Sequence, residues 1–133
     1  MPKLVFFYGT LMTPFNRTGR LRIDQHLVYK GRGTITAALF DLGIYPAAVP
    51  DPDGQVWGEV YEMTHPVIVL RELDELEGHR PSEPEASLYT RRLTSVQMED
   101  GSTVYASAYF YNAPLGRAER IASGDYLEYL RVR

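Results

Sequence analysis

Two short stretches, far apart in the sequence, carry residues that could act together on a small substrate. The first is the turn Tyr8-Gly9-Thr10-Leu11, which ends a short apolar run that begins at Leu4 and has the composition of a buried strand. A glycine at such a point either takes a backbone conformation that a Cβ would forbid or lets another group approach the main chain closely. The turn is therefore either an ordinary connection or a small nest in which the amides of Gly9, Thr10 and Leu11 bind an anion.

The second stretch ends a predicted helix, which we expect to begin at Thr64 as the cap and to run to about Gly78. At about 100° per residue, Glu77 falls inside the apolar arc of this helix, which is formed by Val67, Val69, Leu70, Leu73 and Leu76. A carboxylate there faces the core at the negative end of the helix dipole, and both effects raise its pKa toward values useful for proton transfer. The alternative is that the helix frays by Leu76 and that Glu77 turns into water.

Length and composition limit the classes of protein to which the chain can belong. A chain of 133 residues suits one domain, 1–133, with its own core. The net charge of −3 gives no indication of a nucleic-acid groove or of binding to an anionic membrane. The N-terminal apolar run breaks at Gly9, which is too early for a signal peptide or a membrane span, so we expect a cytoplasmic location.

The residue types that usually bind metals or form covalent intermediates are absent or scattered. There is no cysteine, which excludes disulfides, thiolate zinc sites and cysteine nucleophiles. His26, His65 and His79 show no metal-ligand spacing, so no metal site is predicted. The serines lie in no nucleophile-elbow pattern, and Gly31-Arg32-Gly33 lacks the rest of a phosphate-binding loop.

The elements that position these residues follow from hydrophobic periodicity. Alternation predicts strands over 33–41, 55–63, 88–98 and 103–111, the last two joined as a hairpin by the turn at 99–101. Weaker patterns predict a short helix within 20–29 and another after the cap Asp125. The segment 79–86 holds two prolines and is predicted to be a loop, which could act as a flexible flap.

Two of these strands present polar or aromatic side chains on one face. In 55–63, Glu59 shares a face with Trp57 and Tyr61 and is either a site residue or a charge on the solvent side. In 103–111, a tyrosine stripe on one face indicates either strand packing or a ligand platform, and it comprises Tyr105, Tyr109 and Tyr111.

Five motifs, in this order and spacing, resemble the γ-glutamylcyclotransferase-like (AIG2-like) family. They are Tyr8-Gly9-Thr10-Leu11, Gly43-Ile44-Tyr45-Pro46, Gly58-Glu59-Val60-Tyr61, Leu73-Asp74-Glu75-Leu76-Glu77-Gly78 and Tyr89-Thr90-Arg91. The resemblance covers most of the chain and implies an α+β fold, a small mixed β-barrel flanked by short helices. The loop from His79 to Leu88 departs from the family pattern in its length and its two prolines, and it bears on the substrate entrance.

The resemblance also implies an activity: cyclisation of a γ-glutamyl amide to 5-oxoproline with release of an amine or amino acid, without a cofactor. Glu77 would be the catalytic acid and base, and the turn amides at Gly9, Thr10 and Leu11 would hold the substrate carboxylate. The tyrosines expected to line the pocket are Tyr8, Tyr89, Tyr111, Tyr45 and Tyr126. Such a protein would act as a monomer or homodimer on a small γ-glutamyl substrate. The alternative is a binding module that captures a small carboxylate or amide without turning it over.

Overall fold

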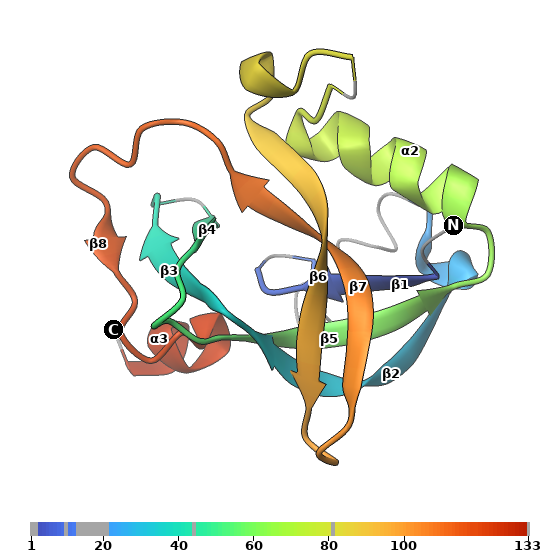
Figure 1. Ribbon diagram of the computed structural model, residues 1–133, viewed down its shortest axis with the longest axis horizontal. Coiled ribbons are helices and arrows are strands. Elements are labelled where there is room, and N and C mark those ends of the chain that lie inside the picture. Colours follow the sequence, from blue (N-terminus) through green and yellow to red (C-terminus); the bar gives the residue numbers. More distant parts are fainter. Residues whose placement is uncertain (1–2, 10, 13–21, 44, 81, 133) are drawn as a thin grey trace.

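The structure is a computed structural model that describes residues 3–9, 11–12, 22–43, 45–80 and 82–132 of the 133 (Figure 1). Its elements, in chain order, are β1 (Leu4–Phe7), the 3₁₀ turn η2 (Asp24–His26), β2 (Leu27–Ile35), β3 (Ala37–Asp41), β4 (Pro46–Pro50), β5 (Val56–Met63), α2 (Pro66–Glu77), the 3₁₀ turn η3 (Pro84–Ala86), β6 (Tyr89–Met98), β7 (Thr103–Tyr111), β8 (Glu119–Arg120) and α3 (Tyr126–Val132).

The centre of the fold is a closed barrel with the strand order β1-β5-β2-β6-β7 (Figure 1). The pair β1–β7 is parallel, with Val5 opposite Ser107, and it closes the barrel, while the other pairs are antiparallel. Figure 1 shows α2 above the barrel strands and α3 beside the second sheet. The expected small mixed barrel flanked by short helices is therefore confirmed.

A 3-stranded sheet with the order β4-β3-β8 lies beside the barrel. The strand predicted over 33–41 is in fact two strands, because the chain bends at Thr36 and passes from β2 in the barrel to β3 in this second sheet. Alternation continues across the bend, so the pattern alone does not reveal it. Neither β4, which begins and ends with proline, nor the short β8 has a strand signal in the sequence.

The helix predicted within 20–29 is wrong over the described part of that segment. Residues 24–26 form the 3₁₀ turn η2, and β2 begins at Leu27. Leu27 pairs with Met63 and Val28 with Glu62 on β5. Pairing with a neighbouring strand thus outweighs a weak amphipathic spacing, as is common for short segments. Residues 20 and 21 lie outside the described residues.

Strands β1 and β5 contribute several residues to the buried core, which also includes residues of the other barrel strands. Val5 and Phe6 of β1 are fully buried, and on β5 Val56, Gly58 and Val60 are buried while the alternate side chains are only half-buried. The predicted two faces of 55–63 are confirmed. Gly58 marks the tightest point, since a Cβ there would lie 2.3 Å from the carbonyl oxygen of Phe7 and 2.5 Å from Cζ of Phe6.

The helix α2 begins at Pro66 with His65 as its cap and without a side-chain cap bond, so the predicted cap at Thr64 is wrong. Its end agrees with the prediction: Gly78 takes the left-handed conformation (φ 68°, ψ 30°), which glycine adopts at little cost. The amide of His79 donates to the carbonyl oxygen of Asp74 at 2.9 Å and closes the last turn. The helix therefore stays regular through Glu77.

The apolar arc of α2 serves two purposes. Its middle, Val69, Leu70 and Leu73, is buried against the barrel. Val67 is 60% exposed, so the predicted arc is wider than the surface that the barrel covers. At the other end, Leu76 is 37% exposed and reaches the rim of a cavity.

The remaining sequence-based elements agree with the structure. The hairpin β6–β7 pairs from Tyr89 opposite Tyr111 to Gln97 opposite Thr103, and the Glu128 amide donates to Oδ1 of the predicted cap Asp125 at 3.2 Å.

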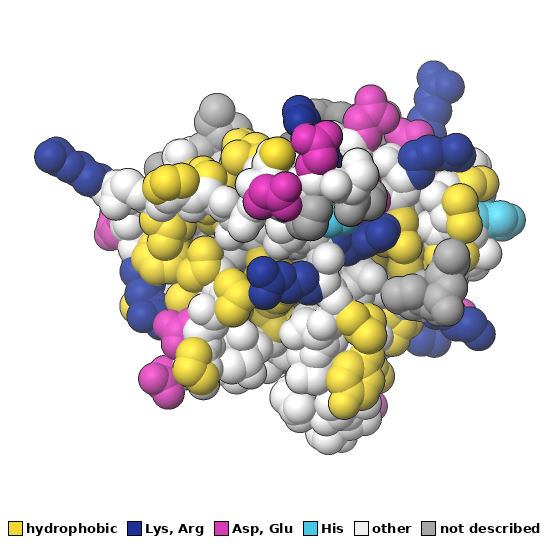
Figure 2. Space-filling model, turned by 45° about the horizontal axis from the view of Figure 1, so that its top comes forward, with side chains coloured by type: hydrophobic (Ala, Val, Ile, Leu, Met, Phe, Trp, Pro, Cys, Tyr) yellow, Lys and Arg dark blue, Asp and Glu magenta, His cyan; other side chains and the backbone are white. Residues whose placement is uncertain are grey.

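On the face shown in Figure 2, acidic and basic side chains are interspersed rather than gathered by sign. Within the described residues, no helix has the length and hydropathy needed to cross a membrane.

We predict that Gly58→Ala lowers the free energy of unfolding by about 2–3 kcal/mol, because the new methyl group has no space beside the Phe7 carbonyl and forces strands β1 and β5 apart. Urea unfolding measures the effect. Gly101→Ala is the matched control: the hairpin turn leaves open space there, so only the strain of its positive φ (91°) remains, at about 1 kcal/mol. Equal stability of Gly58→Ala and wild type would contradict the strand packing described here.

Candidate active site

A cavity of about 140 Å³ opens beside the last turn of α2. Its walls come from the end of β1 and the turn after it, the start of β4, the end of α2, the start of β6 and the last part of β7. The lining residues are Phe6, Phe7, Tyr8, Gly9, Leu11, Tyr45, Pro46, Leu76, Glu77, Leu88, Tyr89 and Tyr109. Glu77 is the one side chain with a formal charge among these described residues, and it is half-buried.

Most of the residues selected from the sequence meet at this cavity. Glu77 lines it together with five others, which are Tyr8, Gly9, Leu11, Tyr45 and Tyr89. Thr10 lies outside the described residues. Two stretches nearly seventy positions apart in the chain are thus brought to one site, because α2 lies above the barrel strands and its last turn lines the same cavity as the turn after β1 (Figure 1).

Two selected tyrosines do not line the cavity. Tyr111 packs behind it, with its ring centroid 5.2 Å from that of Tyr89. Tyr126, at the start of α3, is buried in the hydrophobic core. Tyr109 lines the cavity instead. The sequence pattern places it on the same strand face as Tyr111, and this tyrosine stripe is the signal that could have identified Tyr109. Glu59 also stays outside the lining and accepts a hydrogen bond from the Tyr61 hydroxyl at 3.0 Å.

Gly9 is required at its position because of close approach rather than an unusual φ. A Cβ on Gly9 would lie 2.9 Å from Cγ of Pro46, so the turn after β1 packs directly on the start of β4. The Gly9 carbonyl oxygen accepts a hydrogen bond from the Met12 amide at 3.1 Å, which closes the turn. Gly9 and Leu11 of this turn line the cavity wall.

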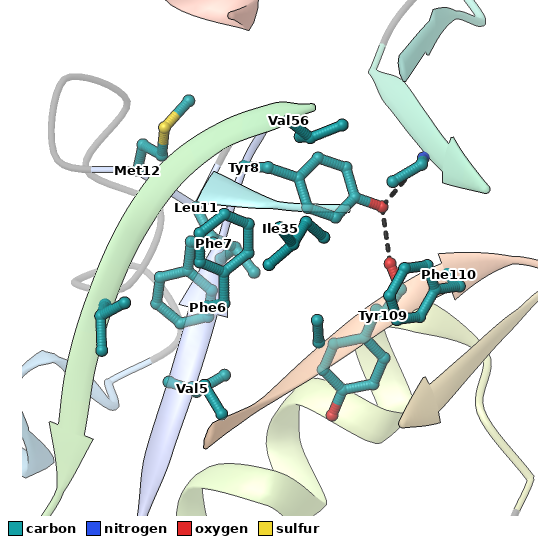
Figure 3. Packing of buried hydrophobic residues seen from close by; sticks show 14 of the residues in the cluster. Val5, Phe6, Phe7, Tyr8, Leu11, Met12, Ile35, Val56, Tyr109 and Phe110 are labelled. Atoms are coloured by element: carbon teal, nitrogen blue, oxygen red, sulfur yellow. Dashed lines mark hydrogen bonds between the residues drawn. The ribbon is translucent and has the colours of Figure 1, made fainter. Parts of the chain in front are cut away.

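The Tyr8 hydroxyl ties the turn to both sheets. It donates to the carbonyl oxygen of Tyr109 on β7 at 2.6 Å and accepts from the amide of Ala48 on β4 at 3.3 Å (Figure 3). Burial raises the pKa of the Tyr8 hydroxyl far above its ordinary value, and the nearby carboxylate of Glu77 raises it further. Tyr8 is therefore neutral at any physiological pH and acts as a fixed support of the site.

Tyr89 is held in a similar way. Its hydroxyl donates to the Pro46 carbonyl oxygen at 3.1 Å, and its ring lies between those of Tyr45 and Tyr111. Burial raises the pKa of Tyr89, with smaller contributions from Tyr8 and then Glu77. This side of the cavity is thus aromatic, and the hydroxyl hydrogen of Tyr89 already has an acceptor within the protein.

A polar cluster fastens the last turn of α2 to the hairpin β6–β7. Asp74 lies one turn before Glu77. Its Oδ1 accepts a hydrogen bond from the Tyr109 hydroxyl at 2.5 Å, and its Oδ2 forms an ion pair with the Arg91 guanidinium at 3.3 Å. The Arg91 amide donates to Nδ1 of His79 at 3.3 Å. Burial raises the pKa of Tyr109, as does its hydrogen bond to Asp74. We call Asp74, His79, Arg91 and Tyr109 the Asp74 cluster.

The loop between α2 and β6 is tied to the rest of the fold through Ser87. Its buried hydroxyl oxygen accepts the Arg80 amide at 2.7 Å, and its hydroxyl donates to the Glu83 carbonyl at 3.2 Å. The side-chain amide of Asn112, just after β7, donates to the Ser87 carbonyl oxygen at 3.0 Å. Leu88, which follows Ser87, lines the cavity, so the end of this loop contributes to the cavity wall.

The three phenols around Glu77 predict a distinct alkaline behaviour. An unfolded tyrosine loses its proton near pH 10, whereas the pKa values of Tyr8, Tyr89 and Tyr109 are raised in the folded state. Above about pH 10 the unfolded chain therefore binds fewer protons, and stability should fall as pH rises. Urea unfolding between about pH 8 and about pH 11 measures this slope, and phenolate absorbance should show at least these three of the ten tyrosines titrating only on unfolding.

The matched pair for this experiment is Tyr8→Phe and Tyr105→Phe. The first should flatten the alkaline loss of stability, while the second, at a side chain that is 64% exposed, should leave it unchanged. Titration of all ten tyrosines in the folded protein near pH 10 would contradict the buried positions described here.

Comparison with known proteins agrees with this geometry. The chain resembles the solved structures of YkqA from Bacillus subtilis (25% identity, TM-score 0.72, 99% of this chain and 42% of that one) and ytfP from Escherichia coli (32%, 0.66, 95% and 97%). It also resembles an AIG2-like protein from Mus musculus (26% identity, TM-score 0.65, 85% of this chain and 80% of that one). The chain thus spans less than half of the Bacillus protein.

No curated protein matches the sequence. The sequence profile of the family described as "Gamma-glutamyl cyclotransferase, AIG2-like" matches residues 5–128, which include β1 with its turn, all of α2 and the hairpin β6–β7. Because that match covers nearly the whole chain, and the barrel and its cavity carry the motifs that indicated the same relationship, the chain belongs to the AIG2-like γ-glutamyl cyclotransferase family.

Proposed function

We propose that the protein is a γ-glutamylcyclotransferase-type enzyme that converts a γ-glutamyl amide to 5-oxoproline and releases the attached amine or amino acid. The observation that carries the proposal is the position of Glu77, which ends α2 and lines a cavity that Gly9 and Leu11 also line. Membership of the family supports the reaction class. We further propose that the chain acts as one cytoplasmic domain, monomeric or homodimeric, without a cofactor.

In the proposed reaction the substrate reacts with itself. Glu77 accepts a proton from the α-ammonium, and the resulting amine attacks the γ-carbonyl carbon to form the new C–N bond of the lactam. Glu77 then returns this proton to the departing nitrogen as the old amide bond breaks. The second proton that the ring nitrogen loses passes through the same carboxylate to the released amine, which leaves as an ammonium ion, so no other reactant is needed. Holding the folded conformer in place supplies much of the acceleration, since aligned intramolecular groups reach effective molarities of about 10⁵ M or more.

The remaining contacts of the described residues are assigned by their place in the cavity, and that of Thr10, which lies outside the described residues, by its position in the sequence motif. We propose that the amides of Gly9, Thr10 and Leu11 bind the substrate α-carboxylate, and that the rings of Tyr8, Tyr45 and Tyr89 enclose its carbon chain. We assign the contacts first expected from Tyr111 and Tyr126 to Tyr109, which lines the cavity whereas those two do not. A cavity built only to capture carboxylates gains nothing from a second negative charge, so Glu77 favours an enzyme over a binding module.

The test of this function is a panel of γ-glutamyl amides that differ in their leaving group: an amino acid, the ε-amine of lysine and a simple alkylamine. We expect the purified protein to release 5-oxoproline from at least one of them. Binding of panel members without any release of 5-oxoproline would support the binding module instead and would contradict the proposed reaction.

With a substrate in hand, Glu77→Gln tests the catalytic residue. The glutamine keeps the shape of the side chain but cannot carry the proton, so kcat should fall by at least about 10²-fold while KM changes little. The free energy of unfolding should hold or rise slightly, since a half-buried neutral amide is less costly than a carboxylate on this helix face.

Glu75→Gln is the matched control, because Glu75 lies in the same turn of α2, is exposed and does not line the cavity. This variant should keep the wild-type kcat. Full activity in a folded Glu77→Gln protein would remove Glu77 from the mechanism.

A further inference from the structure

In three of the four tyrosines that line the cavity with Glu77, the hydroxyl hydrogen is donated to another group of the protein. Tyr8 donates to the Tyr109 carbonyl oxygen at 2.6 Å, Tyr89 to the Pro46 carbonyl oxygen at 3.1 Å, and Tyr109 to Oδ1 of Asp74 at 2.5 Å. A phenol has one hydrogen to donate and oxygen lone pairs to accept. Toward a ligand, these hydroxyl groups can therefore act only as acceptors.

Tyr109 is the strongest of these acceptors. The Tyr8 oxygen already accepts the Ala48 amide at 3.3 Å, whereas the Tyr109 oxygen is bonded through its hydrogen to a charged carboxylate. A hydrogen bond to an ionised acceptor is about twice as strong as a neutral one, and it increases the electron density on the donor oxygen. Asp74 is itself held by Arg91 at 3.3 Å, and its side chain is only 15% exposed. The cluster thus keeps the Tyr109 hydrogen turned away from the cavity.

The rest of the cavity has the same electrostatic character. Glu77 lines the same cavity as Tyr8, Tyr89 and Tyr109. After burial, which is the main cause, its carboxylate contributes to the raised pKa of each of these three hydroxyl groups. Half of the described lining residues are aromatic, and the face of an aromatic ring attracts cations. A carboxylate, phenol oxygens and ring faces together suit a group that is positive and carries several hydrogens, and an ammonium group has both properties.

We propose that Tyr109, held by Asp74 and Arg91, is a specificity residue that accepts a hydrogen bond from the ammonium group of the ligand beside Glu77. The assignment rests on the proposed function, in which this group is the α-ammonium of the γ-glutamyl substrate. After Glu77 takes one proton, the amine still has two hydrogens, and a bond from one of them to Tyr109 directs the nitrogen lone pair toward the γ-carbonyl carbon. Tyr109 then orients the nucleophile without exchanging a proton.

The test uses two probes that differ only in the ammonium group, L-glutamate and glutarate, and measures their affinities by calorimetry. The wild-type protein should prefer L-glutamate. Tyr109→Phe should reduce this preference by about tenfold or more, because a hydrogen bond to a charged group is lost, while the affinity for glutarate stays nearly constant. Tyr105→Phe, an exposed tyrosine on the same strand, is the matched control and should keep the full preference.

A second variant covers the case in which Tyr109→Phe does not fold, as judged by circular dichroism. Asp74→Asn keeps the shape of the side chain but removes its charge, so the Tyr109 hydroxyl becomes a weaker acceptor and the preference for L-glutamate should fall by a smaller factor. Equal affinities of the wild-type protein for the two probes would overturn the proposal. So would an unchanged preference in folded Tyr109→Phe or, failing that, in Asp74→Asn.

This measurement needs no turnover, so it separates the two proposals. A preference that depends on Tyr109, together with no release of 5-oxoproline from any panel member, would leave the ammonium site standing and reject the cyclotransferase. Release of 5-oxoproline, together with a preference for L-glutamate that Tyr109→Phe leaves unchanged, would support the cyclotransferase and reject the role of Tyr109.

Discussion

The attachment of Asp74 to the hairpin β6–β7 is the interaction on which the candidate site depends most. The middle of α2 is held to the barrel by apolar packing of Val69, Leu70 and Leu73, but such packing is non-directional and tolerates small shifts along the helix axis. Asp74 adds two directional contacts one turn before Glu77, with the Tyr109 hydroxyl and with Arg91. Bonds to a carboxylate of this kind contribute about 1.5–3 kcal/mol each, so they fix the height and rotation of the helix end.

A second set of contacts fixes the opposite wall. The turn after β1 packs on the start of β4 through Gly9 and Pro46, and the Tyr8 hydroxyl bridges β7 and β4. The cavity therefore lies where the barrel meets the second sheet, between two parts of the fold that are each tied down by buried hydrogen bonds. A cavity of fixed shape suits a reaction in which the main requirement is to hold one folded conformer of the substrate.

Much of this arrangement can be predicted from the sequence, and the parts that cannot be predicted have physical reasons. The end of α2 follows from Gly78, and the position of Glu77 follows from the helical wheel, since both depend only on neighbours within the helix. The hairpin β6–β7 likewise follows from alternation and its turn. The strand β4 is not predictable locally, because Pro46 and Pro50 at its ends carry no strand signal and its register comes from pairing with β3.

The choice among the tyrosines shows the same limit. Alternation places Tyr109 and Tyr111 on one face of β7, and nothing local distinguishes them. The distinction comes from α2, which lies over Tyr109 and offers Asp74 as its partner, while Tyr111 meets the ring of Tyr89 instead. Asp74 lies outside the apolar arc, and its partners are 17 and 35 positions away (91 − 74 and 109 − 74), so periodicity could not indicate its role.

The central claim is that Glu77 and the turn after β1 face one ligand across this cavity. A crystal structure of the protein with 5-oxoproline, the proposed product, tests that claim most directly. The account predicts the lactam nitrogen within about 3 Å of the Glu77 carboxylate, with the product carboxylate against the amides at Gly9 and Leu11. A product bound elsewhere, or a Glu77 side chain turned away from a product that occupies the cavity, would contradict it.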